Sequence, residues 1–163
     1  MIYGDGGHAK VIREIPVTPV DSVVVAIGDN NTRRKVVRNL EAEWRKKRLP
    51  SKFGVAIHFG AIVSPTAKIG EGTVVMAGAV IQAEAVIGKH CIINTCASVD
   101  HECILQPFVH IAPGAHLCGG VFVGEGGFVG TGVCLAPGFR VPEWTLIKAR
   151  RIKGEDYEGK TSE

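Results

Sequence analysis

The stretch that decides the fold begins IHFGAIVSPTAKIGEGTVVMAGAVI at residues 57–81. Every sixth residue from Ile57 to Ile147 is aliphatic, and the register never slips. Four residues after each aliphatic position stands a mostly small residue, such as Ala61, Thr73 or Ala79. An α-helix repeats near 3.6 residues and a flat strand repeats at 2, so neither explains a period of six.

A coil of three short strands does explain this period, with the aliphatic and the small residues both pointing inward. Fifteen hexads then make five coils of 18 residues, stacked about 4.8 Å apart. No insertion breaks any coil. The sequence therefore predicts a mainly β fold, a parallel β-helix over residues 56–150.

Residues 1–55 follow a different pattern. Residues 1–3 read as a short strand, and a glycine-rich turn then opens a brief helix that stops at Pro16. The apolar run Asp21–Ile27 is typical of a buried parallel strand. Lys52–Ile57 leads into the first coil as a third strand. This alternation predicts a small doubly wound, Rossmann-like domain with a boundary near residue 55.

The second helix of this domain is expected over Arg33–Arg48, with Asn31 or Thr32 as its N-terminal cap. Its many basic residues are more typical of a solvated face than of a phosphate site, because glutamates interrupt them. Arg33 is the basic residue best placed to be an exception. Beyond residue 150 the sequence predicts only a polar tail, residues 151–163.

Composition excludes several classes of protein. The net charge of +3 does not indicate nucleic-acid binding. No stretch approaches the roughly 20 apolar residues of a membrane span, and residues 1–4 do not resemble a signal peptide. We therefore expect a cytoplasmic protein with reduced thiols. The five cysteines lack any C-x-x-C pair and are expected to be small buried filler.

Two glycine-rich turns follow the first two predicted strands. Ligands of open α/β sheets bind at the carboxyl ends of parallel strands, where backbone N–H groups can approach a phosphate. The pair of turns therefore favours a nucleotide site over two plain tight turns. The candidate substrate-binding residues are Gly4, Gly6, Gly7, His8, Gly28, Asp29 and Asn30.

The histidines do not predict a metal site. His110 and His116 stand one hexad apart, so they leave adjacent faces of the prism and cannot share an ion within one chain. His101 is the better candidate for a catalytic role, because Asp100 and Glu102 flank it. Either carboxylate could orient a neutral imidazole as a general base.

Four strings of the sequence resemble the sugar O- and N-acetyltransferases, which are hexapeptide-repeat proteins. The strings are GDGGHAK at 4–10, VAIGDN at 25–30, INTCASVDHEC at 93–103 and FVHIAPGA at 108–115. The family includes bacterial enzymes that N-acetylate nucleotide-linked 4-amino-4,6-dideoxy sugars, and the sialic acid O-acetyltransferases. The likeness covers nearly the whole chain, and the string around position 101 is its most specific part.

The resemblance implies a left-handed β-helix and a homotrimer, with acetyl-CoA in the groove between neighbouring helices. It implies that His101 is the general base and that Glu102 polarises it. Asn94 and His110 would lie near the acetyl and pantetheine end of acetyl-CoA. The Gly119 N–H would receive the developing oxyanion.

The chain departs from the family at both ends. The family's N-terminal domain has a second strand with acidic residues, where this chain has only PVTPV at 16–20. The sugar-nucleotide pocket is therefore expected to be reduced. At the C-terminus, Lys148, Arg150, Arg151 and Lys153 either meet CoA phosphates or form a solvated end.

The sequence thus favours an acetyl-CoA-dependent N-acetyltransferase that acts on a nucleotide-linked amino sugar. One alternative is O-acetylation of a sugar hydroxyl, which would depend more on His101, because a hydroxyl is the poorer nucleophile. The other is a non-catalytic β-helix scaffold. The intact set of candidate catalytic residues argues against the scaffold.

Overall fold

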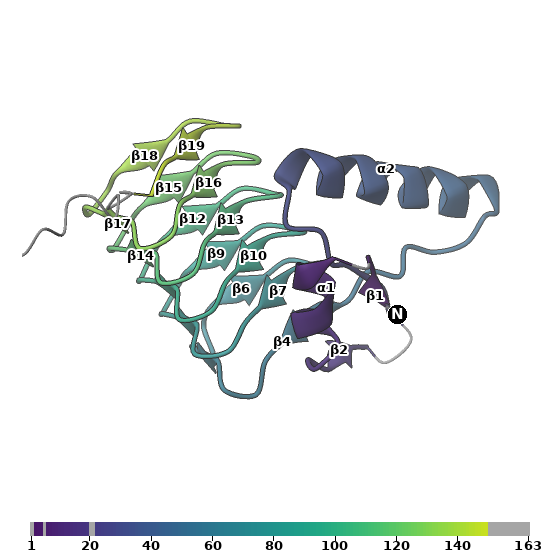
Figure 1. Cartoon of the computed structure of the whole chain (residues 1–163), viewed down its shortest axis with the longest axis horizontal. Coiled ribbons are helices and arrows are strands. Elements are labelled where there is room, and N and C mark those ends of the chain that lie inside the picture. Colours follow the sequence, from purple (N-terminus) through teal and green to yellow (C-terminus); the bar gives the residue numbers. More distant parts are fainter. Residues whose placement is uncertain (1, 5, 20–21, 150–163) are drawn as a thin grey trace, which may run out of the picture.

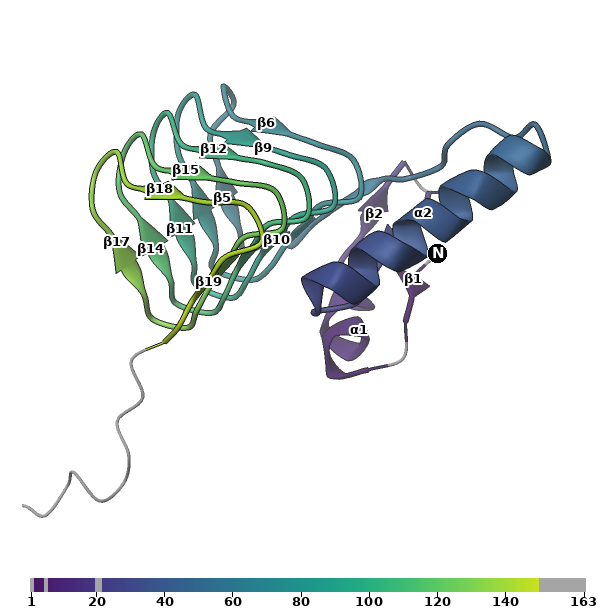
Figure 2. The same cartoon turned by 90° about the horizontal axis from the view of Figure 1, so that it is seen from above.

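The computed structural model of the chain describes residues 2–4, 6–19 and 22–149. Most of them form a β-helix, and a small α/β unit lies against one of its faces (Figures 1 and 2). The basic residues at 150, 151 and 153 and the predicted tail lie outside the described residues. No helix in the described ranges is long and apolar enough to cross a membrane.

The elements follow the chain in order. The N-terminal unit contains β1 (Ile2–Tyr3), α1 (Gly7–Ile12), β2 (Val17–Thr18), β3 (Val24–Val25) and α2 (Asn30–Lys46). The β-helix contains β4 (Val55–Ile57), β5 (Ile62–Val63), β6 (Lys68–Ile69), β7 (Val74–Val75), β8 (Val80–Ile81), β9 (Val86–Ile87), β10 (Ile92–Ile93), β11 (Ser98–Val99), β12 (Ile104–Leu105), β13 (His110–Ile111), β14 (His116–Leu117), β15 (Phe122–Val123), β16 (Phe128–Val129), β17 (Cys134–Leu135), β18 (Arg140–Val141) and β19 (Leu146–Ile147).

The strands of the β-helix form three sheets, one for each face of a triangular prism. The first runs β19-β16-β13-β10-β7-β4-β2, the second β17-β14-β11-β8-β5 and the third β18-β15-β12-β9-β6. We call them faces one, two and three. Within each face, parallel partners are 18 residues apart, as in the pair Ile93 and Ile111. The predicted parallel β-helix of about five coils is therefore confirmed.

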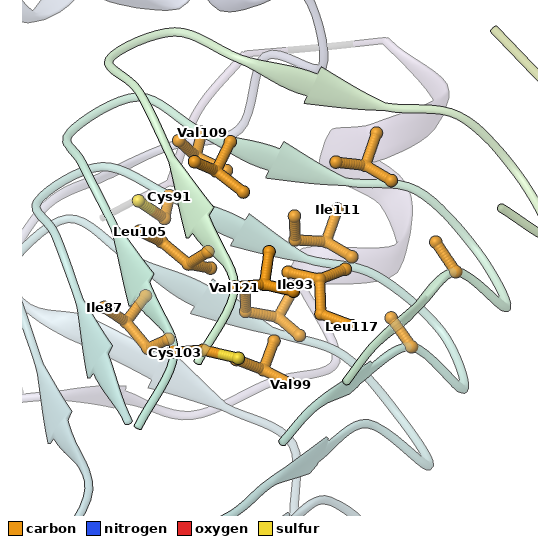
Figure 3. Close-up of a cluster of buried hydrophobic side chains, with 14 of the residues drawn as sticks. Ile87, Cys91, Ile93, Val99, Cys103, Leu105, Val109, Ile111, Leu117 and Val121 are labelled. Atoms are coloured by element: carbon orange, nitrogen blue, oxygen red, sulfur yellow. The ribbon is translucent and has the colours of Figure 1, made fainter. Parts of the chain in front are cut away.

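The interior of the prism is filled by the repeated aliphatic and small residues (Figure 3). Ile93, Val99 and Leu105 are at most 1% exposed, and the small residues between them are buried as well. Cys91 and Cys103 belong to this core, as predicted. Cys96 and Cys134 are exposed, so the expectation of buried filler is wrong for those two.

The corners of the prism explain why the chain is rich in glycine. One residue in most corner turns has a left-handed backbone, with φ between 54° and 74°. Glycine fills seven of these corner positions, because it has no Cβ to clash in that conformation. Glu102 and Trp144 adopt the same conformation at their corners. The repeat therefore imposes the backbone of Glu102.

The N-terminal unit contains a two-stranded parallel sheet, β1 with β3, whose strands are connected through α1 and β2. The expected third strand divides between two sheets. Phe53 forms a parallel bridge to Val23, whereas β4 pairs with β7 of the β-helix. The short segment at 16–20 contains β2, which pairs antiparallel with β4. It therefore extends face one instead of the N-terminal sheet.

The N-terminal end of α2 lies earlier than predicted. Its cap is Asp29, whose side chain accepts a hydrogen bond from the Thr32 N–H at 2.7 Å. The prediction of Asn31 or Thr32 as the cap was wrong by two or three residues. Asp29 is the cap because its backbone is extended, with φ −70° and ψ 122°, whereas Asn31 and Thr32 lie inside the helix.

An apolar interface fixes the N-terminal unit on face one. Ala9 and Ile12 of α1 are buried in one cluster with Val74 and Met76 of the second coil. Figure 1 shows α1 beside β4 and β7, whereas α2 begins next to the later coils and projects away from the β-helix. The two glycine-rich turns are thereby brought next to the outward side chains of face one.

Candidate active site

His101 lies at the corner between faces two and three, in the turn from β11 to β12. Its Nδ1 is 3.1 Å from Glu102 Oε2, while the Asp100 carboxylate accepts the His101 backbone N–H at 2.8 Å. Of the two flanking carboxylates, Glu102 therefore orients the ring and Asp100 orients the backbone. A carboxylate only accepts, so the neutral ring carries its hydrogen on Nδ1 and presents Nε2 as a base.

Gly119 lies one coil further along at the same corner. A Cβ at this position would come within 2.5 Å of His101 Cε1 and Nε2. The imidazole therefore lies directly over Gly119, and any side chain there would displace it. No described residue accepts a hydrogen bond from the Gly119 N–H. The structure thus brings His101, Glu102 and Gly119 together.

Asn94 and His110 form a second group. Asn94 Nδ2 is 3.1 Å from His110 Nε2, and His110 Nδ1 is 3.1 Å from the Gly28 carbonyl oxygen. His110 is buried on face one, between the β-helix and the N-terminal unit. Asn94 lies at the corner between faces one and two. Face two therefore separates Asn94 from His101 within one chain.

A hollow of about 530 Å³ opens beside the glycine-rich turns. Five of the seven predicted substrate-binding residues line it, together with Ala26 and Ile27; the five are Gly4, Gly6, Gly7, His8 and Gly28. His8 Nε2 is buried and has no hydrogen-bond partner among the described residues. The hollow therefore contains a polar atom that a ligand could satisfy.

The other two predicted substrate residues lie elsewhere. Asn30 is buried, and its amide contacts the Gly126 and Gly127 carbonyls at 3.0 and 3.3 Å and Arg33 at 2.9 Å. Its side chain is therefore used to hold α2 on the β-helix. Asp29 lines a separate hollow of about 440 Å³ at the start of α2.

That second hollow continues along face one. It shares Phe128 and Leu146 with a neighbouring hollow of about 480 Å³, which Lys148 also lines. Phe128 pairs in register with His110, and Leu146 pairs with Phe128. An apolar path therefore runs from Phe128, whose ring packs against the His110 ring, toward the C-terminal end of the β-helix.

Trp144 forms one wall of this path, and sequence reasoning did not identify it. The indole packs on Gly126, where a Cβ would come within 2.3 Å of the ring. Arg34 stacks on Trp144 at 3.9 Å and pairs with Glu125 at 3.8 Å. A bulky Trp in a left-handed corner position, which glycine fills at seven other corners, is a local signal that could have been noticed.

Arg33 is the exception expected in α2, but it does not form a phosphate site. It is 1% exposed and donates to four backbone carbonyl oxygens and to Asn30 Oδ1. The carbonyls belong to Ile27, Gly28, His90 and Phe108, at 2.8 to 3.2 Å. Burial lowers the pKa of Arg33 to about 10, so it remains a cation at neutral pH.

Three histidines near Arg33 are held neutral. Burial, followed by the Arg33 charge, lowers the pKa of His110 to about 3 and that of His8 to about 4. Burial also lowers the pKa of His90 to about 4. His90 lies between Phe53 and Phe108, and its Nδ1 has no partner among the described residues. Among these three, none is a cation at neutral pH.

The described residues contain no group of three or more His, Cys, Asp or Glu that could hold a metal ion. His110 and His116 lie on faces one and two, as predicted. Burial raises the pKa of the Cys91 thiol to about 12, so this thiol remains protonated. The strongest candidate for acid–base chemistry is therefore the corner with His101.

The structure is thus a prism of hexapeptide repeats with a histidine–carboxylate pair at one corner. The family model for the bacterial transferase hexapeptide, of six repeats, matches residues 66–101. A comparison with curated protein sequences returns no match.

Solved structures give a closer relation. The acetyltransferase domain of PglB from Neisseria gonorrhoeae FA1090 is 35% identical, over 91% of this chain and 87% of that chain, with a TM-score of 0.81. The same domain in complex with acetyl coenzyme A is 36% identical, over 91% and 86%, with a TM-score of 0.81. PerB from Caulobacter crescentus, in complex with CoA and GDP-perosamine, is 35% identical over 91% and 84%, with a TM-score of 0.78. The chain belongs to the sugar acetyltransferase family of hexapeptide-repeat proteins.

We predict that Arg33→Met strongly destabilises the protein. The substitution keeps the apolar stem but leaves three carbonyls and Asn30 Oδ1 without their donor, which costs roughly 3 kcal/mol or more. Urea unfolding at a fixed protein concentration measures this loss. Arg38→Met, on an exposed part of the same helix, is the control and should change the unfolding free energy by about 0.5 kcal/mol or less. Equal losses would contradict the role of Arg33.

We also predict that stability falls as the pH drops from about 6.5 toward 4. The unfolded chain binds protons at histidine below its ordinary pKa of about 6.5, whereas buried His90 binds them only near 4. This histidine alone therefore removes up to about 3 kcal/mol over that window. His90→Asn, which suits the positive φ, should flatten the pH dependence of the melting temperature. Parallel curves for the two proteins would show that His90 is not the titrating group.

Proposed function

We propose that this protein transfers the acetyl group of acetyl-CoA to the amino group of a nucleotide-linked 4-amino-4,6-dideoxy sugar. The observation that carries the proposal is the corner where His101 is oriented by Glu102 over Gly119. His101 Nε2 takes a proton from the amine as its nitrogen attacks the thioester carbonyl. The C–S bond then breaks, and the leaving thiolate takes the proton back.

The free N–H of Gly119 supports a second part of this chemistry. Negative charge develops on the carbonyl oxygen during the attack, and a fixed backbone N–H stabilises it without reorganisation. Because the thioester is already reactive, one base and one or two N–H donors suffice. No cysteine is needed as a nucleophile, and no metal ion is part of the proposal.

The hollow at the glycine-rich turns is the proposed acceptor site. Its volume lies within the range of small-molecule sites, although the segment at 16–20 adds no strand to the N-terminal sheet. Relatives of the chain support a nucleotide sugar: the GDP-perosamine N-acetyl transferase from Caulobacter crescentus was solved with CoA and GDP-perosamine. Residues 1–55 would then be a Rossmann-like acceptor domain and 56–150 the acetyl-transferring domain.

The apolar path on face one is the proposed site for the arm of coenzyme A. It begins at Phe128, whose ring packs against the His110 ring, and passes Leu146. An apolar floor suits the pantetheine chain, and Lys148 at its far end suits a phosphate. The PglB domain in complex with acetyl coenzyme A supports this part of the proposal.

A complete site requires more than one chain, and we propose the homotrimer. His101 and Gly119 occupy one corner, whereas Asn94, His110 and the acceptor hollow lie across face two. A neighbouring β-helix whose His101 corner faced this chain's face one would bring the two groups together. The left-handed winding of the β-helix belongs to the same proposal.

O-acetylation of a sugar hydroxyl is the alternative, since the same base would serve a hydroxyl. The N-acetyltransferase is favoured because the relative solved with its acceptor sugar is an N-acetyltransferase. A non-catalytic scaffold is not favoured, because it would not require an imidazole oriented over Gly119.

The test is release of CoA thiol with UDP-, dTDP- and GDP-linked 4-amino sugars and with free sialic acid. We expect turnover with an amino sugar and a loss of at least about a hundredfold in kcat for His101→Ala. His116→Ala, which removes an exposed imidazole on face two, is the matched control. Full activity of the His101 variant would show that His101 is not the base. If the protein turned over no acceptor and did not bind acetyl-CoA, the scaffold would be favoured.

Mixed trimers test whether the site is shared. Chains with His101→Ala and chains with Asn94→Ala are each expected to be nearly inactive. When both are co-expressed, every mixed trimer contains one site with both intact groups, so random mixing restores about a quarter of the wild-type activity. If the two groups served a site within one chain, mixing would restore nothing.

A further inference from the structure

The His110 ring is held from both sides in one tautomer. The Gly28 carbonyl oxygen, 3.1 Å from Nδ1, can only accept a hydrogen bond, so Nδ1 carries the ring hydrogen. Nε2 is then an acceptor, and the Asn94 amide donates to it at 3.1 Å. Each ring nitrogen is therefore committed to a protein partner, and the side chain is only 6% exposed.

Asn94 is fixed in turn by this arrangement. Its Oδ1 accepts the Thr95 N–H at 2.8 Å, and one hydrogen of its amide goes to His110. The second amide hydrogen has no partner among the described residues. A single N–H donor with a set direction is therefore presented at the corner between faces one and two, which is half-buried.

The hydrogen bonds from Gly28 through His110 to Asn94 form a chain, which we call the relay. Its other end lies at the acceptor hollow. Gly28 lines that hollow, and its carbonyl oxygen also accepts from Arg33 Nη1 at 3.2 Å. The orientation of this peptide thus depends on two buried donors at once. A ligand that moves or steadies the Gly28 turn would act on the same carbonyl oxygen that holds His110.

We infer that His110 is a positioning residue that links the acceptor hollow to the acetyl-transfer site through Gly28, His110 and Asn94. It sets the direction of the Asn94 N–H and does not itself contact the acetyl group. This inference rests on the proposed function for the identity of the two sites. The relay of hydrogen bonds can be tested without it.

Two substitutions of His110 each keep one of its two hydrogen bonds and remove the other. The amide of His110→Asn can replace Nδ1 as the donor to Gly28 but does not reach Asn94. The longer His110→Gln can offer its carbonyl oxygen to Asn94 in place of Nε2 but leaves Gly28 without its donor. His116→Gln, on face two, is the matched control.

With the acceptor that turns over, we expect His110→Asn to lower kcat by about tenfold to a hundredfold with little change in the acceptor KM. His110→Gln should keep more of kcat but raise the acceptor KM. In both variants the acidic limb of the pH–rate profile, which is the fall of kcat at low pH, should remain, because the general base is assigned to His101 and not to His110. Adding Asn94→Ala to His110→Asn should cause no further loss in kcat. The positioning role is overturned if the limb disappears, if the two losses multiply, or if neither variant changes kcat or KM.

Nitrogen NMR of the histidine rings in the full-length protein tests the relay without substrate. We expect His110 to carry its hydrogen on Nδ1 and to stay neutral at pH 5, and Asn94→Ala to shift its Nε2 resonance. If no acceptor turns over but this tautomer is found, the proposed function fails and the relay stands. If an acceptor turns over but the His110 ring titrates at about 6.5 or carries its hydrogen on Nε2, the proposed relay is contradicted.

Discussion

The guanidinium of Arg33 joins the two parts of the molecule, and the geometry of the candidate site depends on it. It forms no ion pair with a carboxylate among the described residues and donates instead to four carbonyls and one amide oxygen. Those carbonyls come from the end of β3 and from two corners of the β-helix. A buried cation with all its donors satisfied is stable only in one arrangement of its neighbours. It thereby fixes α2, the Gly28 turn and face one relative to each other.

The same cation also explains why the histidines near it do not act as bases. A positive charge and a dry environment both oppose protonation of nearby imidazoles, so His8 and His110 are neutral. They can accept or donate hydrogen bonds but have too little basicity to act as general bases. His101 stands apart from this region at an exposed corner beside a carboxylate. The fold thus separates buried histidines that stay neutral from the exposed histidine that we propose as the base.

The β-helix could be predicted almost completely from the sequence, because each inward position in a period of six carries its own evidence. The pairing of His101 with Glu102 is also local, and adjacency in the sequence made it visible. The contacts of Asn30 and Arg33 with the β-helix could not be predicted, since those partners lie 57 to 97 residues away. Likewise, nothing in a run of glycines shows that the ring of His101 lies on Gly119. Periodicity determines which way a side chain points, but not which distant groups meet it.

The uninterrupted register also has an evolutionary consequence. Inward positions and left-handed corners are occupied by residues that the winding itself requires, so few changes there would be tolerated. Variation is therefore more easily accommodated at outward positions away from the proposed site and in the first 55 residues. A lineage carrying this architecture would diversify its acceptors by remodelling that small appended unit, while the transfer machinery on the prism stayed nearly unchanged.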